Sequence, residues 1–221
     1  MIQPPAFIAF TGVDRADLLP GLIALSARYP IEWGLLVDPD RSGDPLFPDF
    51  DTRQALLSGV GLRWAAHVCG ATARAIVATP DTAVADIAGV QRVQVNHSFA
   101  GSDTHQTAAT ARFGRRHGVR TVLQCKSDFP ADTGVDWLYD VSFGTGICPD
   151  RWPALAADGP FCGYSGGIGP DTVSDVLRAI AAPPGALYWI DMESQIRSDG
   201  LLDLAKCEMV CRAVYGDRVQ S

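Results

Sequence analysis

One aspartate and the glycine-rich stretch after it could perform acid–base chemistry on a bound ligand. Asp140 ends an apolar run in the segment LYDVSFGTGICPDRW and is followed by Gly144, Thr145 and Gly146. A carboxyl group at a strand end, beside an apolar mouth, can act as a general acid when it lies within reach of a substrate oxygen. The glycines indicate that the segment after Asp140 is a loop that faces a ligand.

A second glycine-rich segment could hold an anion such as phosphate. Gly166 and Gly167, in GYSGGIGPDTV, would let backbone N–H groups approach an anion closely, and Pro170 indicates that a helix begins just after them. Ser194, in DMESQIRSDG, can add a hydroxyl group to the same site. These features predict a phosphate site, although the two glycines would also suit a tight turn without a ligand.

Four further side chains are candidates for a base or a nucleophile. His67 and Cys69, in AAHVCG, have the spacing of two side chains on one face of a strand, and a histidine beside a cysteine can stabilise a thiolate. Asp14 lies just beyond the first apolar run, and Lys126 could form a Schiff base or neutralise a phosphate. A buried cysteine and a solvated lysine are the ordinary structural alternatives.

Eight apolar runs can position these residues, because most of the candidates lie at the carboxyl ends of such runs. The runs span residues 6–11, 32–37, 63–69, 91–96, 119–125, 136–141, 160–165 and 186–191. Most of the intervals between them leave room for a helix, which is the alternation of a parallel sheet. Continuous apolar runs are typical of strands that are buried on both faces.

Helical patterns occupy most of the intervals between the runs. Thr52 and Asp103 are the predicted N-caps of helices that end at Gly59 and Gly118. Only KSDFPADTGV separates the fifth run from the sixth, and this segment is too short for a helix between two loops. The sequence therefore predicts an α/β fold, a single-domain (β/α)8 barrel over residues 1–221 whose fifth helix is replaced by a loop.

An open doubly wound sheet is the alternative fold. It would usually carry a glycine-rich phosphate turn after the first strand, where FTGVDRADL has a single glycine. In a barrel, the active site lies at the carboxyl ends of the strands, and phosphate commonly binds after the seventh and eighth. The barrel interpretation therefore brings the candidate residues to one end of the molecule.

Composition excludes several classes of function. Eighteen Lys and Arg residues against 25 Asp and Glu give a net charge of −7 without a basic run, so nucleic acid is not an expected partner. The first residues, MIQPPAFIAF, lack the features of a signal peptide, and no window is apolar enough to span a membrane, so we expect a cytoplasmic protein without a membrane partner. Six scattered cysteines predict reduced thiols, and no motif indicates a metal or a cofactor.

The segments around Asp140, Gly166 and Asp191 together resemble the phosphoribosylanthranilate isomerase family. Where that family has G-G-T-G-x-x-F-D-W, A-G-G-L-x-P-x-N-V and D-V-S-S-G-V-E, this chain has FGTGICPDRW, SGGIGPDTV and DMESQIR. The opening AFTG resembles the family's K-I-C-G, and VQVN resembles its Q-L-H-G. The resemblance implies a barrel that binds a phosphorylated small molecule and catalyses an Amadori-type isomerisation in tryptophan biosynthesis.

The resemblance also implies roles for individual residues. Asp140 would protonate the ring oxygen of a ribose. Phosphate binding is implied for Ser165, Gly166, Gly167, Ser194, Glu193, Gly144, Thr145 and Gly146, and substrate binding for Arg41, Asn96 and Asp191.

The chain departs from the family at the base and at the carboxylate site. Thr11 replaces the cysteine whose thiolate removes the C2 proton, and a hydroxyl group holds its proton too tightly to act as a base near neutral pH. After the second run, either Leu46 has replaced the arginine that binds the anthranilate carboxylate or Arg41 serves from a longer loop. Cys69 and His67, together with Asp14, are the candidates for a substitute catalytic base in this chain.

Three functions therefore fit the sequence. The first is a divergent isomerase in which another residue has become the base. The second is a catalytically silent or re-purposed barrel that still binds a phosphorylated metabolite, and the third is a lyase or aldolase that uses Lys126. No sequence feature predicts the oligomeric state.

Overall fold

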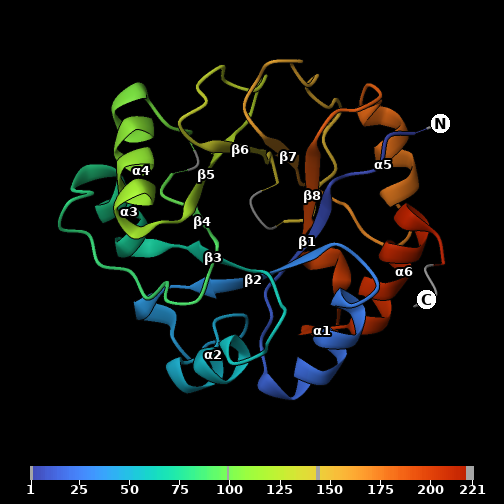
Figure 1. Ribbon diagram of the computed structural model, residues 1–221, viewed down its shortest axis with the longest axis horizontal. Helices are drawn as coiled ribbons and strands as arrows, with labels where there is room; N and C mark the ends of the chain where they lie inside the picture. Colours follow the sequence, from blue (N-terminus) through green and yellow to red (C-terminus); the bar gives the residue numbers. More distant parts are fainter. Residues whose placement is uncertain (1, 99, 143–144, 218–221) are drawn as a thin grey trace.

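Eight parallel strands close into a barrel, which confirms the predicted fold (Figure 1). The computed structural model describes residues 2–98, 100–142 and 145–217, so Gly144 lies outside the described residues. Neighbouring strands pair in chain order, and the barrel closes where Ile8 pairs with Ile190. The strands are β1 (Phe7–Thr11), β2 (Ile31–Val37), β3 (Trp64–Val68), β4 (Arg92–Val95), β5 (Arg120–Cys125), β6 (Asp136–Tyr139), β7 (Cys162–Tyr164) and β8 (Tyr188–Met192).

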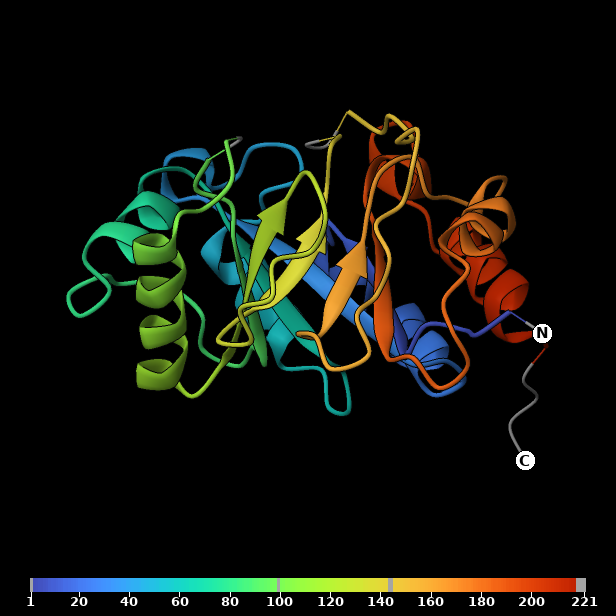
Figure 2. The same cartoon turned by 90° about the horizontal axis from the view of Figure 1, so that it is seen from above.

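Six α-helices in the described part of the chain surround this barrel. They are α1 (Leu19–Ser26), α2 (Phe50–Leu57), α3 (Gly70–Ala78), α4 (Thr104–His117), α5 (Val173–Ile180) and α6 (Leu204–Tyr215). The predicted loop between β5 and β6 is confirmed. A barrel that lacks only its fifth helix would also have a helix between β6 and β7. This expectation is wrong, because the described residues of that connection form only loops, as Figures 1 and 2 show beside these strands.

The helix ends agree with the sequence in one case and differ in two. In α4, Asp103 forms a capping box, and Gly118 ends the helix with a left-handed φ of 66°. The N-cap of α2 is Asp49 rather than Thr52, because the Asp49 carboxylate accepts a hydrogen bond from the Thr52 N–H. Pro170 lies in a turn before α5 and not in its first helical turn.

Side chains along each strand alternate between two apolar clusters, as expected for a period of two. Ile8 and Phe10 of β1 point outwards into the large core between the barrel and the helices. The intervening side chains point into the barrel, where the buried apolar residues are Phe7, Ala9, Val122, Leu138 and Trp189. Cys207 and Cys211, in the last helix, are fully buried in the outer core.

Four aromatic side chains cover β6 and β7 where no helix packs, and we call this group the aromatic cover. Phe129, from the loop before β6, packs edge-on against Tyr164 at 5.2 Å between ring centroids. Trp152, from the loop after β6, packs against Tyr139 and Tyr164 at 6.0 and 5.8 Å. The hydroxyl of Tyr164 donates a 2.7 Å hydrogen bond to the carbonyl of Pro153. The cover therefore fixes the loop after β6, which leads into the cavity.

A buried charged cluster fills the amino end of the barrel, and we call it the barrel floor. Nε of Arg92 lies 3.2 Å from Glu32, and its Nη1 lies 3.8 Å from Asp136. Arg120 pairs with Asp136 at 2.6 Å, and the Arg92 guanidinium lies 4.2 Å from the Trp189 ring centre. This end of a barrel ordinarily contributes stability rather than catalysis. The sequence patterns did not predict this cluster, because each of these charged residues stands alone in an otherwise apolar run.

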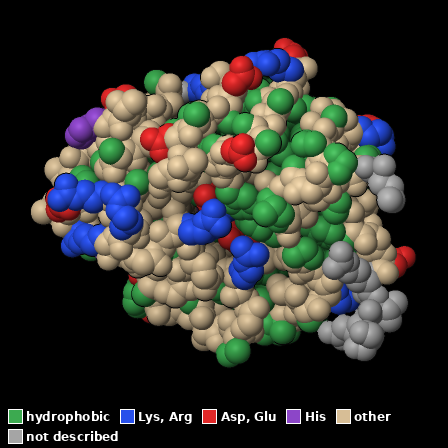
Figure 3. All heavy atoms as spheres, turned by 45° about the horizontal axis from the view of Figure 1, so that its top comes forward, with side chains coloured by type: hydrophobic (Ala, Val, Ile, Leu, Met, Phe, Trp, Pro, Cys, Tyr) green, Lys and Arg blue, Asp and Glu red, His purple; other side chains and the backbone are tan. Residues whose placement is uncertain are grey.

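Charged side chains on the surface are mixed in sign. On the face drawn in Figure 3, the blue Lys and Arg side chains lie close to red Asp and Glu side chains instead of forming one basic field. Exposed pairs of this kind include Arg112 with Asp81 and Arg151 with Asp128, at 2.5 and 2.9 Å. Within the described ranges, none of the helices has the length and apolar character needed to cross a bilayer.

Candidate functional site

A cavity of about 460 Å³ opens at the carboxyl ends of the barrel strands. This volume is within the range of small-molecule sites, and the position is that of barrel active sites. Thirteen residues predicted for the site line it, namely Thr11, Arg41, His67, Cys69, Asn96, Asp140, Gly146, Ser165, Gly166, Gly167, Asp191, Glu193 and Ser194. Thr145 does not line the cavity, because its hydroxyl donates a 2.6 Å hydrogen bond to the carbonyl of Ser142.

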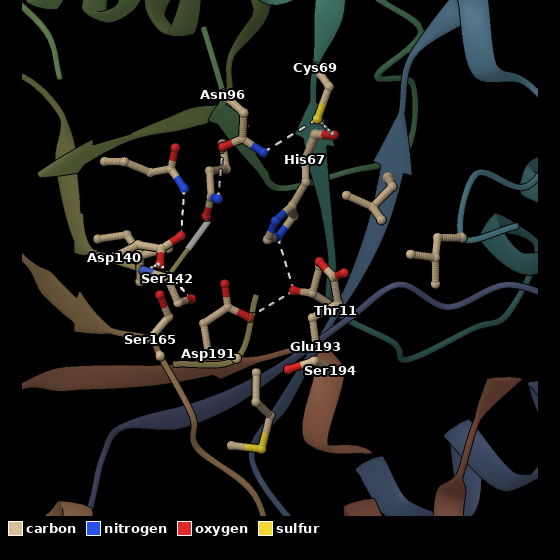
Figure 4. A pocket seen from close by; sticks show the side chains of 18 of the residues that line it. Thr11, His67, Cys69, Asn96, Asp140, Ser142, Ser165, Asp191, Glu193 and Ser194 are labelled. Atoms are coloured by element: carbon tan, nitrogen blue, oxygen red, sulfur yellow. Dashed lines mark hydrogen bonds between the residues drawn. The ribbon is translucent and has the colours of Figure 1, made fainter. Parts of the chain in front are cut away.

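Asp140 follows directly after β6, and hydrogen-bond donors hold both of its carboxylate oxygens (Figure 4). Nε2 of Gln124, from β5, donates to Oδ2 at 2.9 Å. The N–H and the hydroxyl of Ser142 donate to Oδ1 at 2.9 and 3.0 Å. Gln124 and Ser142 were missed in the sequence. Two-residue alternation along the fifth strand could have indicated Gln124, since Val122 and Gln124 both face inwards.

Asp191, on β8, is a second carboxyl group in the same cavity and is joined to β1. The hydroxyl of Thr11 donates a 2.7 Å hydrogen bond to its Oδ1. Burial is the main cause that raises the pKa of Asp191 to about 7, and the negative charges of Glu193 and Asp140 raise it further. The bond from Thr11 and the charge of Arg92 act in the opposite direction. A carboxyl group with this pKa exchanges a proton readily near neutral pH.

His67 packs behind Thr11 and is neutral. Its Nε2 lies 3.4 Å from the Thr11 hydroxyl oxygen. Complete burial, aided by the charge of Arg92, lowers the pKa of His67 to about 3. Because the Thr11 proton goes to Asp191, the Thr11 oxygen acts as an acceptor, which assigns the imidazole proton to Nε2. Gly34 makes room for this arrangement, since a Cβ there would lie 2.7 Å from the Thr11 hydroxyl oxygen.

Cys69 and His67 both line the cavity, as their spacing in the sequence predicted. Their expected pairing as a thiolate and an imidazole is wrong. The Cys69 thiol points towards the backbone carbonyl of His67 at 3.7 Å and accepts a 3.5 Å hydrogen bond from Nδ2 of Asn96. Burial raises the pKa of the Cys69 thiol, so the neutral form is favoured.

The turn after β7 presents backbone groups to the opposite wall of the cavity. Gly166 and Gly167 have φ values of 115° and 61°, and the first of these is a conformation that only glycine adopts readily. Within the described chain, the N–H groups of both residues have no hydrogen-bond acceptor. Ser165 faces the same cavity and donates to the carbonyl of Tyr139 at 3.2 Å. These N–H groups, together with Ser194 in the same cavity, could therefore contact an anion.

Solved structures with a similar arrangement of the whole chain include phosphoribosylanthranilate isomerases. The enzyme from Thermotoga maritima is 12% identical, with a TM-score of 0.59 over 95% of this chain and 98% of its own. The enzyme from Pyrococcus furiosus is 12% identical, with a TM-score of 0.59 over 94% and 98% of the two chains. That from Thermococcus kodakaraensis is 14% identical, with a TM-score of 0.57 over 96% and 99%. The chain has the fold of these isomerases. No protein-family model and no curated protein matches it.

In this barrel, the loop after β2 and helix α3 place arginine side chains at the cavity mouth. Arg41 and Leu46, the two candidates for the carboxylate site, both line the cavity. Arg41 lies 4.0 Å from the Phe47 ring centre and is exposed. Arg74, which was missed in the sequence, also lines the mouth. His97 lines it too, with its Nε2 2.7 Å from the hydroxyl of Ser102.

Two other candidates lie outside the cavity. Asp14 faces Arg197 in an ion pair and accepts a 3.0 Å hydrogen bond from the N–H of Leu202, so it joins the loops after β1 and β8. Lys126 is exposed and is not among the residues that line the cavity. Among the residues that the structure describes, no three His, Cys, Asp or Glu side chains are grouped so that they could hold a metal ion.

Proposed function

We propose that this protein is an acid–base isomerase of phosphorylated sugars, related in reaction to the phosphoribosylanthranilate isomerases whose fold it has. The observation that carries the proposal is the position of Asp140. Its carboxyl group is held by Gln124 and Ser142 and faces a cavity that Gly166 and Gly167 also line. An acid–base group and an anion site in one cavity fit a substrate that carries both a reacting sugar and a phosphate.

The cavity walls suit the hydroxyl groups of a sugar. Gln94 donates a 3.0 Å hydrogen bond to Asn96, and the Asn96 amide continues to the Cys69 thiol. Weak acceptors such as a thiol are readily exchanged for a substrate hydroxyl. The apolar side chains of Leu36 and Met192 line the same cavity. Mixed walls with a few polar groups are typical of sites that orient a small polar ligand.

In the proposed reaction, Asp140 in its acid form donates a proton to the ring oxygen of a sugar whose C1 carries nitrogen. The C1–O bond breaks, its electron pair stays on the ring oxygen, and the nitrogen lone pair forms an iminium at C1. A base then removes the proton from C2 to give an enaminol, which becomes the ketose when C1 is protonated and the C2 hydroxyl loses its proton. The narrow form of this proposal is the isomerisation of N-(5'-phosphoribosyl)anthranilate in tryptophan biosynthesis.

Carbon-bound hydrogen exchange provides the direct test of this proposal. The protein is incubated in D2O with N-(5'-phosphoribosyl)anthranilate, and incorporation of deuterium into the sugar is followed by NMR. We expect exchange by the wild type and a loss of about 10³-fold or more in Asp140→Asn, since a positioned acid or base contributes rates of this order. Inorganic phosphate should still raise the unfolding midpoint of the variant, because binding to the native state stabilises it by mass action.

The outcomes separate an isomerase from a catalytically silent barrel. Wild-type protein that binds phosphate but exchanges no hydrogen would favour a silent phosphate-binding barrel. Unchanged exchange in Asp140→Asn would remove Asp140 from the reaction. Rescue of a strain that lacks phosphoribosylanthranilate isomerase, and the absence of rescue by Asp140→Asn, would establish the narrow form.

A further inference from the structure

Building on the proposed function, we propose that Asp191 is the catalytic base that removes the C2 proton, and that Thr11 is the residue that positions it. The family to which the sequence bears a resemblance has a cysteine base where this chain has Thr11. In this chain, the base would therefore be on β8 instead of at the end of β1, and a single hydrogen bond joins Asp191 to the residue at the family's base position, Thr11.

The geometry of Asp191 leaves one carboxylate oxygen available to a substrate. Only 6% of the residue is exposed, yet it lines the cavity. Oδ1 accepts the hydrogen bond from Thr11, whereas Oδ2 has no donor among the described residues. In the view of Figure 4, the Asp191 side chain lies between Thr11 and the group formed by Asp140 and Ser142. A substrate held against Asp140 would therefore meet Asp191 from the other side.

The neighbouring groups are unsuited to remove a carbon-bound proton. The Thr11 hydroxyl is a donor to Asp191, and an alcohol is too weakly acidic to serve as an alkoxide near neutral pH. His67 is a very weak base, with its pKa lowered to about 3 by burial. Burial raises the pKa of the Cys69 thiol and keeps it protonated. Asp140 is the proposed acid, so its carboxyl group is protonated when the reaction begins.

Asp191 also has the basicity that the step requires. Its pKa of about 7, raised mainly by burial, makes it a stronger base than an ordinary aspartate and leaves a large ionised fraction at neutral pH. Glu193 is the other carboxyl group on this side of the cavity. Burial raises the pKa of Glu193 as well, and the positive charge of Arg197 only opposes this, but Glu193 is less buried than Asp191 and is therefore tested beside it.

Two carboxyl groups are sufficient to balance the protons and electrons of this reaction. Oδ2 of the Asp191 carboxylate takes the C2 proton, the C2–H electron pair forms the C1–C2 double bond, and the iminium π electrons return to nitrogen. Protonated Asp191 exchanges its proton with solvent water and then donates a proton to C1. The C2 hydroxyl loses its proton to the Asp140 carboxylate as the ketone forms, so both residues recover their starting states without another reactant.

Thr11 is suited to orient this base because its own geometry is fixed from two sides. It is 2% exposed, it donates to Asp191, and it accepts from the neutral imidazole of His67. Gly34, paired with Thr11 across β1 and β2, leaves space for both contacts. The chain from His67 through Thr11 to Asp191 therefore holds Oδ1 in place and leaves Oδ2 towards the ligand.

The test compares Asp191→Asn, Glu193→Gln and the exposed control Asp158→Asn in the deuterium exchange assay. We expect Asp191→Asn to lose exchange by about 10³-fold, which is the scale of a positioned base, and Asp158→Asn to exchange like the wild type. The rise of kcat/KM with pH should have its midpoint near 7 in the wild type, as set by Asp191. Retained exchange in Asp191→Asn, or its loss in Glu193→Gln alone, would overturn the proposal.

Positioning by Thr11 is tested with Thr11→Val, which keeps the shape without the hydroxyl, and with Thr11→Ser, which keeps the donor. Loss of a donor to the carboxylate should move the midpoint of the pH profile upwards in Thr11→Val and lower kcat about tenfold. Thr11→Ser should restore both, whereas identical effects of the two substitutions would indicate packing alone. Wild-type protein that exchanges no hydrogen would overturn the proposed function and this inference together; an active wild type with an active Asp191→Asn variant would overturn this inference alone.

Discussion

The hydroxyl of Thr11 lies 2.7 Å from Oδ1 of Asp191 and donates a hydrogen bond that joins the first strand of the barrel to the last. β1 and β8 are also the strands that close the barrel by backbone pairing. Thr11, the residue that would position the base, therefore lies on one of the two strands whose pairing closes the barrel. Its position depends on the stability of the whole barrel rather than on a mobile loop.

Asp191 should make the protein less stable as the pH rises. Its pKa in the folded protein, about 7, is above its ordinary value of 3.8, so its stabilising contribution is fully present below about pH 4 and is lost as the pH rises through 7. Three pKa units correspond to about 4 kcal/mol. We therefore expect Asp191→Asn to exceed the wild type in free energy of unfolding by a few kcal/mol at pH 8 and to match it near pH 4.

Urea unfolding at these two pH values checks this prediction. Asp158→Asn, on the exposed surface, is the control and should follow the wild type at both. An equal difference between Asp191→Asn and the wild type at pH 4 and pH 8 would mean that Asp191 does not titrate in this range.

Gly34→Ala should disturb Thr11 and His67. The new Cβ would lie 2.7 Å from the Thr11 hydroxyl oxygen and 3.0 Å from Nε2 of His67, and overpacking of this kind costs about 1–3 kcal/mol. We expect reduced stability and a reduced exchange rate. Because Thr11→Ala removes the atom that is contacted, the double variant should lose less stability than the sum of the two single variants. Additive losses, measured by urea unfolding, would contradict this coupling.

Gly166→Ala should weaken phosphate binding. The φ of 115° at this position strains any residue with a side chain, and the added Cβ would lie 3.0 Å from the carbonyl oxygen of Ile147. Strain of about 1–3 kcal/mol would displace the turn and its N–H groups. Gly185→Ala is a matched control, because its φ is 82° and its surroundings are empty. Both variants should lose stability, but only Gly166→Ala should lose the phosphate-induced rise of the unfolding midpoint.

Arg92→Met should destabilise the barrel strongly. The substitution leaves the buried carboxyl groups of Glu32 and Asp136 without the cation between them, and breaking a buried pair costs about 3–5 kcal/mol. Arg63 contacts the same Glu32 at 3.7 Å but is half exposed, so Arg63→Met should cost less than about 1 kcal/mol. Equal losses in the two variants, measured by chemical denaturation, would show that burial does not govern this cluster.

Much of the fold follows from local sequence patterns. Apolar runs bounded by turns predicted all eight strands, and the pattern from Asp103 to Gly118 predicted α4 with both of its caps. The missing helix between β6 and β7 was not foreseen, because its replacement depends on rings from three segments. Phe129, Trp152 and Tyr164 are apart in the sequence and meet in the folded barrel.

The site was predictable to the extent that its residues lie at strand ends. Asp140 and Gly166 were placed in the cavity from the order of the strands alone. The chemistry of Asp191 was not visible in the sequence, because its raised pKa arises mainly from burial in the folded barrel. For the same reason, Cys69 was a plausible thiolate from its neighbours but is a buried neutral thiol in the structure.

The aromatic cover links substrate selectivity to resistance against unfolding. The connection after β6 contributes Ser142 and Gly146 to the cavity, and the same connection contributes Trp152 to the outer wall. Laboratory evolution of this connection would therefore alter two properties at once. Libraries that randomise positions near Ser142 and keep Trp152 and Pro153 should yield folded variants with new ligand preferences, whereas libraries that include Trp152 should yield mostly insoluble protein.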